Sequence, residues 1–211
     1  MEMFTAIRSS TLGITIFAVV TAALIAVTQV STKDRILKNE REAQAKALYE
    51  IVPRDQIDND MLEDTVSFVA PGLLGHDQPV DAYRARKAGQ VIAVILPVTA
   101  PDGYSGAINM IVGITRDGSV AGVRVLSHKE TPGLGDKVDL KKSDWILSLN
   151  DQRNDDDQRA GFAVKKDGGR FDQFTGATIT PRAVVNATAR ALDYFRINKA
   201  ALLEPKIARA E

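Results

Sequence analysis

The stretch Ala107–Leu126, AINMIVGITRDGSVAGVRVL, decides the fold class of this chain. Two runs of β-branched and other apolar residues flank Asp117-Gly118, a dipeptide that is typical of the tight turn in a β-hairpin. We therefore expect one strand over residues 107–115 and an antiparallel partner over residues 120–126.

Further segments on both sides extend the expected sheet. Thr65–Val69 and Val91–Val98 are short, apolar and rich in β-branched residues, and Phe162–Val164 is another strand candidate. Residues 54–64 are acidic and turn-like, and residues 150–159 form a charged loop. These segments predict a sheet whose strands are joined by short polar connections.

Two helices are expected after the hairpin. Ser143 opens a short helix that runs to Leu149. A longer helix has Thr180 at its N-cap, Pro181 at its first position and apolar residues from 183 to 195. The sequence therefore predicts an α+β domain with a mainly antiparallel sheet and flanking helices.

The N-terminal part of the chain has no charged residue between Arg8 and Lys33. Its centre, Leu12–Val30, would be roughly 28 Å long as a helix, close to the ~30 Å hydrocarbon thickness of a bilayer. A retained membrane span is favoured over a cleaved signal peptide, because the apolar run is too long for one and no small-x-small cleavage site precedes Ser31. A buried helix of a soluble core would rarely be apolar on every face.

The chain is thus expected to consist of five parts. These are a short N-terminus at 1–8, a transmembrane anchor at 9–31, an amphipathic stalk and linker at 32–64, the main domain at 65–198 and a C-terminal tail at 199–211. The stalk is expected to be helical up to Pro53. Basic residues after the span would place the main domain in the cytoplasm, but acidic residues are interspersed and the rule weakens for long domains, so composition leaves the side open.

Composition excludes several kinds of chemistry. The 27 basic and 27 acidic residues balance, so there is no basic field for a nucleic-acid backbone, and we expect no nucleic-acid partner. There is no cysteine and there are only two histidines, which argues against disulfides, thiolate metal sites, a catalytic thiol and a haem centre. We expect no metal site, and any redox chemistry would need an organic cofactor.

Two glycine-bearing segments stand out as candidates for a site. His128–Lys137, HKETPGLGDK, follows a predicted strand, and its glycines permit close approach of the backbone to a flat ligand. Gly168–Pro181, GGRFDQFTGATITP, brings three threonines to the start of a helix, a favourable position for a phosphate. By composition alone, the first could be an ordinary loop and the second a turn with a capping threonine; neither matches a nucleotide-binding fingerprint.

The run Gly168–Val185 resembles the flavinylation region of the FMN-binding domain that RnfG and NqrC subunits of ion-pumping membrane complexes share. In that family, the last threonine of an [ST]-G-A-T pattern carries FMN through a phosphoester, and Thr178 is the matching residue. The family's second motif, E-T-P-G-L-G, matches Glu130–Gly135. Two motifs in the right order make the resemblance specific, and it extends over residues 1–198. Chain length favours RnfG over NqrC.

The resemblance implies an electron carrier with covalent FMN at Thr178, attached by a separate flavin transferase, ApbE. The chain would sit in the bacterial inner membrane as a single-pass protein among other Rnf/Rsx-type subunits, with 1–8 in the cytoplasm and 65–198 as a periplasmic FMN-binding domain. No residue is expected to be catalytic. The expected cofactor-binding residues are Thr175, Gly176, Ala177, Thr178, Glu130, Thr131, Gly133, Leu134, Gly135 and Lys137.

Several roles within this site stay open. The amides of Gly133 to Gly135 are expected to donate to the ring, while Glu130 and Thr131 orient the loop or touch the ring. Lys137 either adds positive charge or is a solvated surface residue. Tyr104 either packs near the flavin or fills the core, and His128 is expected to be structural rather than catalytic. Asp172 and Gln173 either help to hold the turn or are recognised by the flavin transferase.

Three alternatives to this function remain. An NqrC-type subunit of a Na⁺-pumping quinone reductase would share the same chemistry. A cofactor-free membrane assembly subunit would leave Thr178 unmodified. A solitary flavin-binding regulator would not copurify with membrane partners.

Overall fold

The computed structural model describes residues 2–154 and 161–204. Residues 155–159 of the charged loop expected at 150–159 and the last part of the expected tail, 205–211, lie outside the described residues, as does Met1. The chain divides into two compact units, residues 1–44 and 45–211. Helix α1 (Glu2–Ile51) makes up the first unit and continues into the second.

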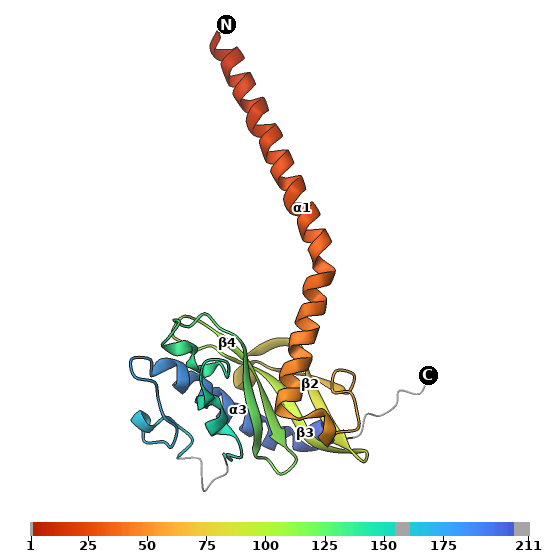
Figure 1. The fold of residues 1–211 in the computed structure, drawn as a ribbon, viewed down its shortest axis with the longest axis vertical. Helices are drawn as coiled ribbons and strands as arrows, with labels where there is room; N and C mark the ends of the chain where they lie inside the picture. The colour runs from red at the N-terminus through yellow and green to blue at the C-terminus, as the bar shows by residue number, and fades with distance from the viewer. Residues whose placement is uncertain (1, 155–160, 205–211) are drawn as a thin grey trace. The chain divides into compact units, whose positions relative to one another are not determined.

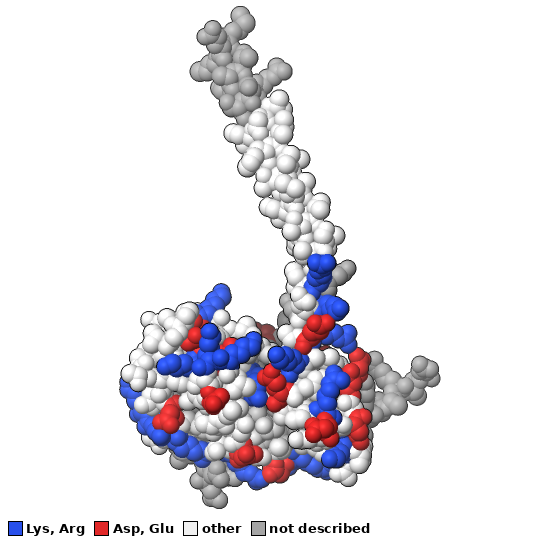
Figure 2. Space-filling view, viewed as in Figure 1, with Lys and Arg blue, Asp and Glu red and all other residues white. Residues whose placement is uncertain are grey.

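Within α1, the 23 residues Thr11–Lys33 are long and apolar enough to cross a membrane, by length and composition. Figure 2 shows much of this part of the helix without Lys, Arg, Asp or Glu side chains. The hydroxyls of Thr15, Thr28 and Thr32 each donate to a carbonyl four residues earlier, at 2.8 Å. These polar groups are therefore satisfied within the helix, as an apolar environment requires. The helix expected before Pro53 is confirmed and ends at Ile51.

The second unit contains a five-stranded sheet in the order β1-β2-β3-β4-β5, with every neighbouring pair antiparallel (Figure 1). The predicted hairpin is confirmed, with Gly118 at φ 94° in its turn. The fold class, an N-terminal apolar helix followed by an antiparallel sheet with flanking helices, is also confirmed. The strands are β1 (Thr65–Ala70), β2 (His76–Lys87), β3 (Gln90–Ala100), β4 (Ile108–Thr115) and β5 (Val120–Ser127).

Both faces of the sheet are covered by other parts of the unit. Val94, Leu96 and Val98 of β3 face a core that includes α3 (Ile179–Leu203). The alternate residues Ala93 and Ile95 face a second core formed with the end of α1 and the linker that follows it. Burial from both sides explains why β3 is almost continuously apolar in sequence.

The glycines of β4 and β5 make room for the end of α1. Gly113 and Gly122 are paired across the two strands. A Cβ at Gly113 would lie against Ile51 Cγ2 closer than packing allows, and one at Gly122 would lie 3.3 Å from the same atom. The bare backbone at this pair therefore forms the surface on which Ile51 packs.

At three places the structure differs from the local predictions or adds to them. The strand expected at 162–164 is wrong: it makes only the isolated bridge from Val164 to Phe171, since residues 165–168 turn the chain back at once. Strand β2 was not predicted. The short helix after Ser143 forms as a 3₁₀ helix, η3 (Asp144–Leu149), with the Ser143 hydroxyl accepting from Trp145 N at 3.2 Å.

Helix α3 begins earlier than the sequence predicts. Thr178 stands at its N-cap position, and Thr180 lies inside the helix with only 1 % of its surface exposed. Thr180 cannot cap the helix, because its hydroxyl donates to Glu130 instead. The helix also continues past Asn198 to Leu203, where the buried Leu202 anchors its last turn.

Candidate functional site

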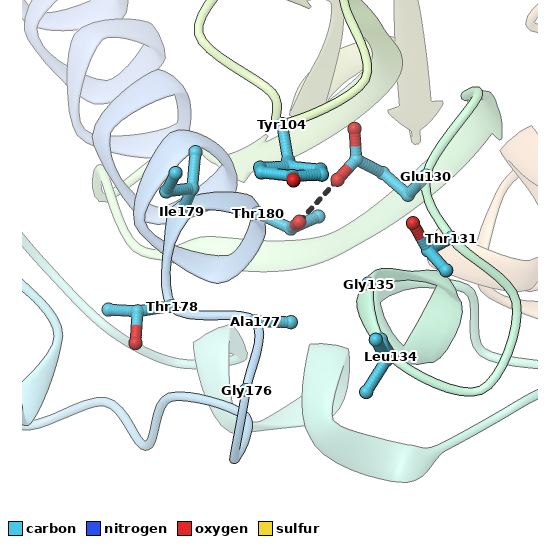
Figure 3. Close-up of a pocket in the computed structure, with 10 residues that line it drawn as sticks. All are labelled: Tyr104, Glu130, Thr131, Leu134, Gly135, Gly176, Ala177, Thr178, Ile179 and Thr180. Atoms are coloured by element: carbon cyan, nitrogen blue, oxygen red, sulfur yellow. Dashed lines mark hydrogen bonds between the residues drawn. The ribbon is translucent and has the colours of Figure 1, made fainter.

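Three segments meet where strands β3 and β5 end, and they enclose a pocket. Strands β3 and β5 run in the same direction, so the loops that follow them leave the sheet on the same side. The start of α3 joins these loops there. The pocket has a volume of about 230 Å³ and is lined by Tyr104, Glu130, Thr131, Leu134, Gly135, Gly176, Ala177, Thr178, Ile179 and Thr180 (Figure 3).

The two motifs found in the sequence therefore face each other across one cavity. Of the ten predicted site residues, seven line the pocket: Glu130, Thr131, Leu134, Gly135, Gly176, Ala177 and Thr178. Thr175, Gly133 and Lys137 are exposed and do not line it. Lys137 lies in the short 3₁₀ helix η2 (Gly135–Val138), two residues after the pocket-lining Gly135.

Glu130 holds the three segments of the pocket together. Its side chain is buried, with 4 % of the residue exposed. One carboxylate oxygen accepts from the Thr180 hydroxyl at the start of α3, and the other accepts from Ser105 N at 2.9 Å, in the loop after β3. His128 Nδ1 accepts from Glu130 N at 3.1 Å, so His128 has a structural role.

The missing side chain at Gly135 leaves room for this arrangement. A Cβ there would lie 2.8 Å from Thr180 Oγ1 and 2.9 Å from Glu130 Oε2, closer than side-chain packing allows. Gly176, on the opposite wall, has φ 81°, a conformation that residues with a side chain rarely adopt. The two glycines explain why both motifs need this residue type.

The backbone amides of the Glu130–Gly135 motif do not have the partners that the sequence analysis expects. Leu134 N and Gly135 N both donate to Thr131 O at 3.1 Å, inside the loop's own turn. They are therefore engaged rather than free for a ligand. Polar groups of the pocket that can face a ligand come instead from Thr131 and from the first turn of α3.

The turn before α3 is fixed by its neighbours. Asp172 accepts from Lys165 Nζ at 2.5 Å, and its backbone oxygen accepts from Trp145 Nε1 at 2.7 Å. The Gln173 side chain accepts from Lys166 N at 3.2 Å. The Trp145 ring also meets Phe174 edge to face, with centroids 5.1 Å apart. Asp172 and Gln173 thus hold the turn that carries Thr178.

An ion pair secures the same turn from the helix side. Arg182 Nε and Nη2 donate to the two oxygens of Asp167 at 2.5 and 2.7 Å. This hydrogen bonding and the positive charge of Arg182 lower the pKa of Asp167 below its usual value. Since Arg182 N also donates to Thr178 O at 3.3 Å, the pair lies close to the start of α3.

The pocket fits a flat cofactor that carries a phosphate. No side chain caps the first turn of α3 among the residues that the structure describes. The amides of such a turn point along the helix axis and favour an anion. Tyr104, Leu134 and Ile179 provide apolar surface at the pocket, and Tyr104 is 69 % exposed, so it does not fill the core. Within residues 2–154 and 161–204, His, Asp and Glu form no cluster that could hold a metal ion.

The comparisons with known proteins agree with this geometry. Residues 103–193 match the model of the FMN-binding domain, and residues 1–51 match that of the RnfG N-terminal region. The first match spans all three segments of the pocket, and the second spans α1.

Curated relatives cover nearly the whole chain. A Pseudomonas aeruginosa protein, named as the G-type subunit of an ion-translocating oxidoreductase complex, is 52 % identical over 193 residues, which are 92 % of this chain and 90 % of that protein. Proteins of the same name from Pseudoalteromonas atlantica and Vibrio vulnificus are 47 % and 44 % identical, over 93 % and 95 % of this chain and 91 % and 95 % of their own lengths.

Proposed function

The chain belongs to the family of G-type subunits of ion-translocating oxidoreductase complexes, and from this premise we propose that it carries electrons within such a complex through FMN attached covalently to Thr178. One observation carries the proposal: Thr178 lines the pocket in which both motifs meet, at the start of α3. The FMN-binding domain supports the cofactor, and the position of Thr178 supports the attachment point.

Attachment requires a hydroxyl and a place for the phosphate. The Thr178 oxygen forms a bond to the phosphorus of the FMN half of FAD, the pyrophosphate bond breaks, AMP leaves and the hydroxyl proton is released. We assign this reaction to a separate flavin transferase of the ApbE type. The first-turn amides of α3 then stabilise the remaining phosphate charge.

When bound, FMN supplies the capacity to accept and release electrons one at a time. The residues of the pocket bind and partly cover it. Leu134 and Ile179 offer apolar contacts, and Glu130 keeps the loops in place through Thr180. A pocket of about 230 Å³ is smaller than the ~300–1,000 Å³ that typically encloses a ligand, so part of the cofactor stays at the surface. An exposed redox group suits a relay.

The proposal extends to location and partners. The span at Thr11–Lys33 anchors the chain in the bacterial inner membrane, with the FMN-binding domain in the periplasm. The partners are the other subunits of the complex, the lipid bilayer and the flavin transferase. Protease treatment of spheroplasts tests the orientation: degradation of the domain in intact spheroplasts is expected, and protection until lysis would contradict a periplasmic domain.

The attachment is tested on the full chain coexpressed with the flavin transferase. Intact mass and peptide mapping should show one added FMN on the peptide that contains Thr178. Thr178→Ala should abolish the added mass, whereas Thr178→Ser, which keeps the hydroxyl, should retain part of it. An unmodified Thr178 beside a transferase that flavinylates a control substrate would overturn the proposal and favour a cofactor-free assembly subunit.

A further inference from the structure

Three of the residues that line the pocket have large apolar side chains that are exposed. Tyr104, Leu134 and Ile179, here called the pocket rim, are each at least 42 % exposed (Figure 3). Elsewhere in described residues 45–204, the exposed large apolar side chains are Val69, Leu126, Leu147 and Ile197. Three of these seven residues therefore border one cavity.

The pocket is too small for its walls to cover a whole flavin nucleotide. The pocket rim would then surround an exposed part of the cofactor. Exposed apolar side chains grouped at one place on a soluble domain mark a surface that another molecule covers. Aromatic and aliphatic anchors of this kind are typical of the centre of a protein–protein interface.

Positive charge lies next in sequence to residues that line the pocket. Residues 128–142 carry four exposed lysines, here called the lysine group: Lys129, Lys137, Lys141 and Lys142. None of them forms an ion pair with a residue that the structure describes. The acidic residues of the same segment are less exposed than its lysines. Glu130 and Asp136 are buried, and Asp139 is half-buried and accepts from Lys141 N at 3.0 Å. The exposed charge of the segment is therefore positive, although the whole chain is neutral.

We propose that the pocket rim and the lysine group form a docking surface for the acidic surface of a redox partner protein within the complex. The rim supplies the apolar centre of the contact, and the lysines supply the charged border that orients the partner. The inference rests on the proposed function. In the docked state one electron passes between the partner's redox group and the flavin: the donor loses it, the acceptor gains it and no bond forms.

Zero-length cross-linking tests the contact in native membranes that contain the assembled complex and the flavinylated full chain. A water-soluble carbodiimide should join members of the lysine group to Asp or Glu residues of another subunit. About 0.5 M salt should suppress these links, because it shortens the range of charge attraction to a few ångströms. Lys87 is the matched control: it is exposed, but lies at the start of the β2–β3 turn, roughly 30 Å from the pocket end of β3.

Charge reversal tests the consequence. Lys141→Glu combined with Lys142→Glu should slow electron exchange between the flavin and the rest of the complex at least about tenfold at low ionic strength, and the difference should shrink at high salt. Lys87→Glu should leave the rate unchanged. The flavin content of each variant is measured by mass.

The outcomes separate the two proposals. Links from the lysine group to another subunit, together with the salt-dependent loss of rate, support the docking surface. If flavin is present on Thr178 but links form only at Lys87, or if the double variant keeps the wild-type rate, the docking surface alone is overturned. Flavin missing from the wild-type chain overturns the proposed function and this inference with it.

Discussion

Two carboxylates, one just before the first strand of the sheet and one after the last, are held in different ways. Asp64, just before β1, is held by two guanidinium groups: Arg84 Nε donates to it at 2.8 Å, and Arg86 Nε donates to its other oxygen. Glu130, at the pocket, accepts instead from the hydroxyl of Thr180 and the amide of Ser105, which are both neutral.

The difference separates scaffold from site. Arg84 also donates to Glu204 O at 2.8 Å and to Thr65 O at 3.3 Å, so the Asp64 cluster ties the linker, β1, β2 and the end of α3 together. The Glu130 cluster instead joins two loops and the start of α3 around a cavity. Charge compensation by arginine makes the first cluster strong, whereas the second relies on hydrogen-bond geometry that small changes can disturb.

The largest expected effect comes from breaking the Asp64 cluster. Asp64→Ala leaves the buried guanidinium of Arg84 without its carboxylate, and an uncompensated buried charge destabilises strongly. We expect the free energy of unfolding to fall by about 3 kcal/mol. Urea denaturation of the solubilised chain measures it. The control is Asp55→Ala at an exposed site, and a loss no greater than in this control would contradict the scaffold role.

The same cluster predicts a dependence on pH. Burial raises the pKa of Asp64, but the hydrogen bonds and charges of Arg86 and Arg84 outweigh it and lower the pKa below its usual value. The stabilisation is thus fully present above the ordinary carboxyl pKa of about 3.9 and is lost as pH falls through the lower folded-state value. The wild-type chain should lose more stability than Asp64→Ala in this acidic window.

A smaller loss is expected at the pocket. Glu130→Ala leaves the buried Thr180 hydroxyl and the Ser105 amide without their acceptor, which should cost about 2 kcal/mol. Hydrogen exchange at the Ser105 amide should accelerate at the same time. Glu130→Gln keeps one carbonyl acceptor and should lose less. Unchanged exchange at Ser105 in the alanine variant would show that Glu130 does not order the loop.

Local signals predicted the elements that depend on local physics. Asp117-Gly118 predicts its hairpin because the turn needs a residue with positive φ, and Pro181 predicts a helix because its fixed φ and missing N–H suit a first turn. Strand β2 escaped prediction because Arg84 and Arg86 interrupt its apolar pattern. Both arginines donate to Asp64, which lies 20 and 22 residues away in sequence, so their removal from solvent could not be read from the strand itself.

The site shows the same limit. Each motif predicted its own residues, but Thr180 was assigned to a cap because its partner Glu130 lies 50 residues away in sequence. Tyr104 joins the pocket because β3 and β5 run in the same direction and therefore end on the same side of the sheet. Lys137, two residues from Gly135 in η2, is exposed and does not line the pocket. Contacts between distant segments, rather than residue types, were what the sequence could not reveal.

The smallest expected effect concerns Gly135, and it measures how strongly the pocket cluster acts as a unit. Gly135→Ala places a Cβ 2.8 Å from Thr180 Oγ1 and 2.9 Å from Glu130 Oε2, so their hydrogen bond must shift. The substitution should cost about 1 kcal/mol in the wild-type chain. In the Glu130→Ala background that bond is already absent, and about half of this cost should disappear. Urea denaturation of the four chains gives the coupling. Equal costs in both backgrounds would mean that the clash is relieved elsewhere, and that Glu130, Thr180 and Gly135 do not act together.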